Sequence, residues 1–279
     1  MTDHPRGPMT DLHDEFNPKK LDVVAALTEA YKGAWANLGE MVRLIWLPVV
    51  LNLVLSIVVL LLPADNNVLL TLALQAASLF LWAIISVAWY RYILLNEKPA
   101  GSYQINFGRR EARYLLVLIA LVLLALPIML FGGPPEFPPS AAMKSALAST
   151  GSAASLIEFF GLLLAFVGLY FLVRLLLLLP AVSIDEPVNV RMVLERTRGN
   201  FWRLVLLTLL SSVPVMIVYA LILAVTAALF LPEEVAIFLQ TLVSIFFNIV
   251  NIAVLAIAYR ELIGPPGAMA ADLDRPDTI

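Results

Sequence analysis

Six long apolar runs, separated by short polar segments, dominate the pattern of this 279-residue chain. Each run reaches about 18 residues or more, roughly the length that a helix rising about 1.5 Å per residue needs to cross about 30 Å of hydrocarbon. The pattern therefore predicts an all-α polytopic membrane protein with six transmembrane helices. The runs are Leu44–Leu62, Val68–Tyr90, Tyr114–Phe131, Phe159–Val182, Leu204–Leu231 and Val235–Ala258.

Two shorter stretches have the spacing of amphipathic helices. The first follows Asp22, a residue suited to cap a helix, and its apolar stripe contains Val24, Leu27, Tyr31, Ala34, Trp35 and Leu38. The second follows Pro187 and places Val190, Val193, Leu194, Thr197 and Phe201 on one face. For the first helix, both a position in the membrane interface and packing against the ends of the bundle agree with the stripe.

The remaining segments suggest a simple division of the chain. Residues 1–22 are polar and charged, which predicts a disordered cytoplasmic tail. Residues 23–263 form the predicted transmembrane domain. Its longest connection, 132–158, is rich in proline, glycine and small residues, so we expect an external loop with one short helix over Ala141–Ala148. Residues 264–279 are predicted to be a second flexible cytoplasmic tail.

Composition supports lipid as the solvent for most of this chain. Hydrophobic residues make up 61% and charged residues 14%, against about 45–50% and about 25% in a soluble domain. The mean hydropathy is +0.90. A net charge of −3 gives no reason to expect a nucleic-acid partner. The chain has no cysteine, and its histidines, His4 and His13, both lie in the first tail, so we expect no cofactor, metal site or catalytic cluster.

The distribution of basic residues predicts the orientation. Seventeen of the 18 Lys and Arg residues fall on one side of the six runs, and only Lys144 falls on the other. Positive charge in short loops marks the cytoplasmic face of a membrane protein. The chain is therefore expected in a bacterial inner (plasma) membrane, with both termini in the cytoplasm.

The odd and even runs each begin or end in a similar way. Gly39, Gly108 and Gly199 each precede an arginine at the start of an odd run, and Arg91, Arg174 and Arg260 stand near the ends of the even runs. This pattern agrees with three hairpin repeats of one orientation. It agrees equally with coincidence, because arginine is expected at cytoplasmic helix ends in any case.

Neutral polar residues inside the runs provide the candidate intramembrane site. Gln240, Ser244, Asn248 and Asn251 fall within about 80° of one another around a helix in the last run, while Asn52 and Gln75 stand in the first two runs. An amide that faces lipid would lack hydrogen-bond partners. These side chains are therefore expected either to join helices to one another or to line a cavity. Gly161, Ala165 and Gly168 form a small-residue stripe that predicts close helix packing.

Arg174 is the one basic residue within a run. An arginine about 9 Å from the interface can extend its side chain to the headgroups. Alternatively, the guanidinium is buried and binds an anion or a lipid phosphate. We expect the Arg174 side chain to extend to the headgroups, and a buried guanidinium that binds an anion is the alternative.

The stretch from Val173 to Leu210, VRLLLLLPAVSIDEPVNVRMVLERTRGNFWRLVLLTLL, is the most distinctive part of the chain. Its Leu-Pro helix end, acidic elbow and Thr-Arg-Gly-Asn-Phe-Trp-Arg-Leu phrase resemble the YciC-like group of bacterial six-span membrane proteins. The stretch also resembles the membrane domain associated with glycerophosphodiester phosphodiesterases. The resemblance implies a six-span membrane domain; the phosphodiesterase activity belongs to a separate soluble domain and is not implied.

Three functions remain open from the sequence. The first is an integral membrane protein without catalytic activity that packs with membrane lipids or a membrane-protein partner. The second is a small-solute or lipid transporter with a neutral polar cavity lined by the last run. The third is a lipid-modifying enzyme, which would need Asp185, Glu186 and Arg203 to converge at the cytoplasmic interface.

Overall fold

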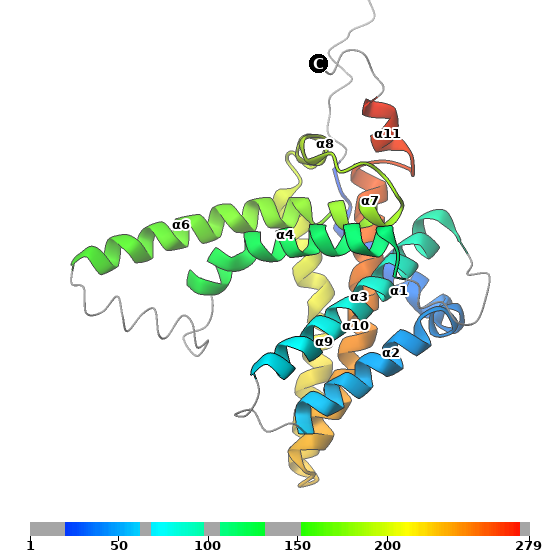
Figure 1. Ribbon diagram of the computed structural model, residues 1–279, viewed down its shortest axis with the longest axis vertical. Helices are drawn as coiled ribbons and strands as arrows, with labels where there is room; N and C mark the ends of the chain where they lie inside the picture. The colour runs from blue at the N-terminus through cyan, green and yellow to red at the C-terminus, as the bar shows by residue number, and fades with distance from the viewer. Residues whose placement is uncertain (1–19, 62–67, 98–106, 132–151, 274–279) are drawn as a thin grey trace, which may run out of the picture.

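The computed structural model describes residues 20–61, 68–97, 107–131 and 152–273, and all of its regular elements in these ranges are helices (Figure 1). The helices are α1 (Val23–Ala36), α2 (Leu38–Leu61), α3 (Val68–Leu95), α4 (Arg109–Phe131), α6 (Ser152–Leu175), α7 (Leu178–Ser183), α8 (Val190–Arg196), α9 (Phe201–Ala228), α10 (Glu233–Leu262) and α11 (Ala268–Leu273). The predicted all-α class is confirmed.

Five helical segments in the described ranges are long and apolar enough to cross a membrane, so the chain is a multi-pass membrane protein. They are Leu72–Leu95, Arg109–Phe131, Phe159–Ser183, Phe201–Ala228 and Glu234–Leu262. The first predicted run lies in α2, where the apolar segment Trp46–Val58 is shorter than a span. A sixth span therefore stays a prediction.

The long helices pair as three hairpins. α2 packs against α3, α4 against α6, and α9 against α10, and these are the most extensive helix pairings in the described structure. The hairpins point in different directions: α4 and α6 run across the view in Figure 1, whereas α9 and α10 run along its vertical axis. The hairpin arrangement agrees with the predicted repeat, but a symmetry axis along the membrane normal stays a prediction.

The buried core lies where the three hairpins meet, and we call this region the junction. It comprises 83–90 of α3, 114–121 of α4, 173–184 of α6 and α7, 201–207 of α9 and 245–263 of α10, with α1, α8 and α11 packed against them. Trp89 and Tyr259 are almost fully buried there. Trp89 Nε1 donates to the carbonyl oxygen of Ile249 at 3.2 Å, which joins α3 to α10. The junction thus holds the three hairpins together.

The small-residue stripe on α6 packs against α4, as predicted. A Cβ atom on Gly161 would lie 2.2 Å from the Phe131 ring, and one on Gly168 would lie 3.1 Å from the carbonyl oxygen of Leu124. Ala165 between them is 7% exposed. Small side chains let two backbones approach closely in a membrane. This surface is therefore used within the chain.

The first amphipathic helix packs against the bundle. Asp22 caps α1 by accepting hydrogen bonds from the amides of Val24 and Ala25 at 3.1 and 3.0 Å, as predicted. The buried face, however, consists of Ala26, Ala30 and Ala34, which pack with α9 and α10. Val24 and Trp35 of the predicted apolar stripe are 68% and 70% exposed and lie outside this buried face, whereas Ala34 of the same stripe lies in it. Alanine spaced every four residues allows a closer approach of helices than the larger apolar side chains do.

Helix α8 differs in its start from the helix expected after Pro187. It begins at Val190, and the side chain of Asn189 caps it by accepting from the amide of Met192 at 3.0 Å. Val193 and Thr197 of the predicted face are buried, whereas Val190 is exposed. Asparagine at a helix N-terminus satisfies amides that have no intrahelical partner.

Several predicted boundaries shift in the structure. Leu21, at the end of the predicted first tail, is buried. α6 begins at Ser152, inside the predicted loop 132–158, and the short helix expected over Ala141–Ala148 lies outside the described residues. α11 occupies part of the predicted second tail, and its Met269 is fully buried. The folded region therefore extends to Leu273, because buried apolar side chains anchor both ends of the domain to the junction.

Candidate functional site

Two of the predicted intramembrane polar residues form hydrogen bonds between helices. Asn251 Oδ1 on α10 accepts from Ser211 Oγ on α9 at 2.9 Å. Asn52 Oδ1 on α2 accepts from Ser78 Oγ on α3 at 2.5 Å. Each bond lies within one hairpin. Such bonds stabilise pairs of membrane helices by about 0.6 kcal/mol on average.

The remaining polar candidates do not converge with these two. Asn248 is exposed and donates to the carbonyl oxygen of Ser244, one turn earlier in its own helix, at 2.8 Å. Ser244 Oγ in turn donates to the carbonyl oxygen of Thr241 at 2.7 Å. Gln240 is half-buried, and Gln75 is exposed. The predicted face of the last run is thus divided between interhelical bonding at Asn251 and local bonding at Asn248.

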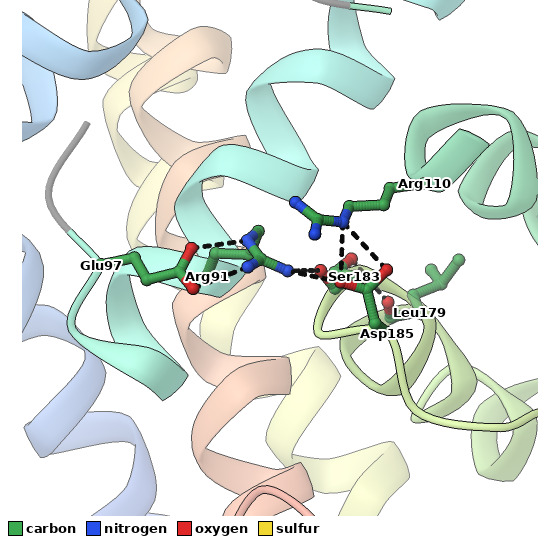
Figure 2. A network of polar contacts seen from close by, with 6 residues as sticks. All are labelled: Arg91, Glu97, Arg110, Leu179, Ser183 and Asp185. Atoms are coloured by element: carbon green, nitrogen blue, oxygen red, sulfur yellow. Dashed lines mark hydrogen bonds and ion pairs between the residues drawn. The ribbon is translucent and has the colours of Figure 1, made fainter. Parts of the chain in front are cut away.

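Charged groups concentrate instead in the junction, where Asp185 joins two helices (Figure 2). Arg91 of α3 donates to Asp185 Oδ2 at 3.1 Å and also binds Glu97 at 2.6 Å. Arg110 of α4 binds the same Asp185 oxygen at 2.7 Å. Asp185 follows α7 and has a φ of 64°, a left-handed conformation that is uncommon outside glycine, asparagine and aspartate. The turn at this residue places its carboxylate between the end of α3 and the start of α4.

The neighbouring carboxylate of Glu186 has a different role. This side chain is buried and accepts hydrogen bonds from the amides of Gly267 and Met269 at 2.6 and 3.1 Å. It therefore holds the start of α11 against the elbow after α7. Arg203, the third group of the predicted enzyme site, donates to the carbonyl oxygen of Leu21 at 2.8 Å. Asp185, Glu186 and Arg203 thus each bind a different part of the chain.

Replacement of Glu186 by alanine should release α11. Hydrogen bonds to a charged group contribute about 1.5–3 kcal/mol each, so we expect amide hydrogen exchange over 267–273 to accelerate at least tenfold. Mass spectrometry of exchange in detergent micelles measures this effect. Glu195→Ala, a change at an exposed glutamate of α8, is the control. Unchanged exchange over 267–273 in Glu186→Ala would contradict the assigned role.

The distinctive phrase between α8 and α9 joins the start of the chain to the membrane helices. Asn200 Oδ1 accepts from the amide of Leu21 at 3.1 Å, and Arg203 binds the carbonyl of the same residue. Gly199 has a φ of 79° and forms the bend. In the sequence, Asn200 is distinguished only by its place in the phrase before the fifth run, and Leu21 is not distinguished at all. The hydrogen bond between them could not be predicted because the two residues are 179 positions apart.

Arg174 is buried, with 5% of its surface exposed, so the expectation that it extends to the headgroups is wrong. Nε donates to Thr197 Oγ1 at 2.8 Å, Nη1 donates to the Tyr170 hydroxyl at 2.5 Å, and Nη2 donates to the carbonyl of Leu194. The guanidinium carbon lies 4.9 Å from the centre of the Tyr170 ring, a cation–π contact. Two of the acceptors, Leu194 of α8 and its C-terminal cap Thr197, come from the segment that packs against the end of α6.

An open pocket of about 570 Å³ lies beside Arg174. Arg191, Glu195 and Arg198 come from α8 and the turn after it, while Tyr170 and Arg174 come from α6. The lining contains three arginines and one glutamate, a net charge of +2. Glu195 binds Arg191 at 2.9 Å, and both side chains are mostly exposed. Exposed pairs of this kind contribute little to folding stability. The net charge of +2 already includes the Glu195 carboxylate.

Comparisons with known proteins find no family model, no curated protein and no solved structure that matches this chain. The resemblance to the YciC-like group and to the phosphodiesterase-associated membrane domain therefore stays a prediction.

Proposed function

We propose that this chain is an integral inner-membrane protein without catalytic activity, whose splayed hairpins pack with membrane lipid. The observation that carries this proposal is the apolar surface beyond the junction. On α6, Leu163 and Phe166 are 49% and 54% exposed, and large apolar side chains of α9, such as Met216 and Ile217, are also exposed. Surfaces of this kind mark contact with lipid or with a partner helix.

The polar bonding inside the hairpins supports a structural role over transport. A transporter of the predicted kind would need the face of Gln240, Asn248 and Asn251 in the last run to line a wet cavity. Asn251 instead accepts a serine hydroxyl from the paired helix. Transport remains the alternative, and it rests on Asn248, whose exposed amide lies on the same helix as Asn251.

The arginines of the junction support an orientation with both termini in the cytoplasm. Arg91, Arg110, Arg174, Arg203 and Arg260 lie at the ends of α3, α4, α6, α9 and α10, and all of them bind groups near the junction. Arginine is retained on the cytoplasmic side during insertion. Under this proposal, the junction faces the cytoplasm and the far ends of the hairpins lie toward the opposite face of the membrane.

Spin labelling tests where lipid contacts the chain, and the absence of cysteine makes every introduced cysteine the single attachment point. Leu163→Cys and Phe166→Cys should give nitroxides that collide often with oxygen, which is lipid-soluble, and rarely with a water-soluble nickel complex. Ala165→Cys, on the face packed against α4, should collide rarely with both. The measurement is power-saturation electron paramagnetic resonance in lipid bilayers.

The outcomes separate the possible functions. Frequent nickel collisions at Leu163→Cys would contradict lipid contact. Infrequent collisions with both reagents at that position in native membranes would show that a protein partner covers α6 in place of lipid. A label at Asn248→Cys should show the same collision frequencies as one at Leu163→Cys. Frequent collisions of the Asn248→Cys label with the nickel complex would favour the transporter over the structural protein.

A further inference from the structure

The charge balance around Arg174 differs from that of Arg91, Arg110 and Arg260. Arg91, Arg110 and Arg260 each bind at least one carboxylate. In the described part of the chain, the three acceptors of Arg174 are a threonine hydroxyl, a tyrosine hydroxyl and a backbone carbonyl, all of them neutral. A guanidinium remains protonated when buried. Burial of a cation without an anionic partner is unfavourable, so this site favours an anion.

The pocket beside Arg174 is open and carries a net positive charge that such an anion would balance. Three of the five guanidinium N–H groups have acceptors within the chain, which leaves two for a ligand. Arg198 and Arg191 add further donors to the pocket lining. A net charge of +2 matches a phosphate group, which carries between one and about two negative charges. Clustered guanidinium groups also match phosphate in geometry.

The position of the pocket favours a phosphate that belongs to a lipid. Residues 184–200, which contain α8, connect the candidate spans Phe159–Ser183 and Phe201–Ala228, so the pocket lies at the edge of the membrane. Val190 of the pocket lining is exposed, and so are Val188 and Trp202, which lie close to its arginines in the sequence. Arginine next to exposed apolar and aromatic side chains is typical of segments that lie at the boundary between headgroups and acyl chains.

We infer that the pocket formed by Tyr170, Arg174, Arg191 and Arg198 binds a phosphate group, supplied by the headgroup of an anionic lipid. This inference rests on the proposed function for the source of the phosphate, since only a membrane-embedded chain has lipid at this position. The phosphate would complete the coordination of Arg174 and hold α8 against the end of α6. A soluble phosphate has the same chemistry and is the alternative source.

Lipid binding to the full-length protein in neutral detergent tests the site. Native mass spectrometry measures the dissociation constants of phosphatidic acid, phosphatidylglycerol and phosphatidylcholine with identical acyl chains. We expect the two anionic lipids to bind more tightly than phosphatidylcholine. Arg198→Gln should weaken them by about five- to tenfold, the effect of removing one arginine charge near a headgroup. Arg198 is exposed, so its replacement should not prevent folding.

Arg196→Gln is the matched control, because Arg196 is an exposed arginine two residues before Arg198, at the end of α8, and is not part of the pocket lining. It removes the same charge and should leave binding unchanged. An equal loss of binding in Arg196→Gln and Arg198→Gln would overturn the site, since it would indicate a diffuse electrostatic surface. Arg174→Lys keeps the charge but removes the planar fork, and it should weaken binding in protein that folds.

A second arm uses inorganic phosphate at millimolar concentration. Displacement of the anionic lipid in wild-type protein would confirm phosphate recognition. If inorganic phosphate stabilises the protein while the three lipids bind with equal dissociation constants, the ligand of the site is a soluble phosphate and not a lipid headgroup. If neither the lipids nor inorganic phosphate bind, the inference is overturned. The spin-label test at Leu163 does not depend on this binding, and the phosphate measurement does not depend on lipid contact at Leu163. The two experiments therefore distinguish a failure of the phosphate site from a failure of the proposed function.

Discussion

Replacement of Gly168 by leucine should destabilise the α4–α6 hairpin. A Cβ at this position already lies 3.1 Å from the carbonyl oxygen of Leu124, a backbone atom that cannot rotate away. Overpacking of this kind costs about 1–3 kcal/mol. The loss should appear as a lower midpoint of SDS-induced unfolding, followed by circular dichroism in mixed micelles.

The glycine at position 39 provides the matched control. A Cβ on Gly39 has no other atom within 4 Å, so Gly39→Leu should leave the unfolding midpoint nearly unchanged. Ile128 lies next to Gly168 across the helix pair, 3.8 Å from the added Cβ. Adding Ile128→Ala to Gly168→Leu should therefore restore part of the lost stability. Equal midpoints for Gly168→Leu and Gly39→Leu would show that the two helices do not pack as described.

Replacement of Asn200 by leucine should detach the start of the chain from the junction. The side chain is buried and accepts from the amide of Leu21. Without it, a buried N–H group loses its acceptor, at a cost of about 1–3 kcal/mol. We expect amide hydrogen exchange over 21–30 to accelerate about tenfold or more, while exchange in α10 changes little.

The neighbouring residue distinguishes this specific bond from a general disturbance of α9. Trp202 is 70% exposed, so Trp202→Ala should leave exchange over 21–30 unchanged. Arg203→Gln removes the donor to the carbonyl of Leu21 and should reproduce part of the Asn200→Leu effect. If exchange over 21–30 stays slow in both Asn200→Leu and Arg203→Gln, the Ala26, Ala30 and Ala34 face alone holds α1 in place.

The Thr-Arg-Gly-Asn-Phe-Trp-Arg-Leu phrase has a structural use in this chain. Thr197 accepts from Arg174, Asn200 and Arg203 bind Leu21, and Gly199 forms the bend before α9. The phrase thus joins α6, α8, α9 and the start of α1 at one point. Phe201 extends the contact by packing against Tyr170, with ring centres 5.0 Å apart.

Local sequence predicts the candidate site only in part. The small-residue stripe on α6 was identifiable from spacing alone, because a helix of known periodicity fixes which residues share a face. The same periodicity grouped Gln240, Ser244, Asn248 and Asn251. It could not show that Asn251 faces α9 while Asn248 is exposed, because the direction of a face depends on where the neighbouring helices lie.

Arg174 illustrates the same limit for a charged residue. Its distance from the helix end permits both an extended and a buried side chain. The choice depends on α8, which supplies Thr197 and the carbonyl of Leu194 as acceptors. No feature of residues 170–178 by themselves indicates where α8 lies, so the basic pocket becomes visible only in the folded chain.

The sequence by itself determined that this is an all-α membrane protein with several spans, where most of its helices lie, and which α6 surface packs closely. Apolar run length, periodicity and glycine placement are local properties, and they follow from the cost of exposing a backbone to hydrocarbon. The tertiary structure decided which ends of the hairpins meet, which face of α1 is buried, and which carboxylate binds which arginine. Those choices depend on contacts between residues far apart in the chain, such as Leu21 with Asn200 and Arg260 with Glu29, and local sequence does not specify them.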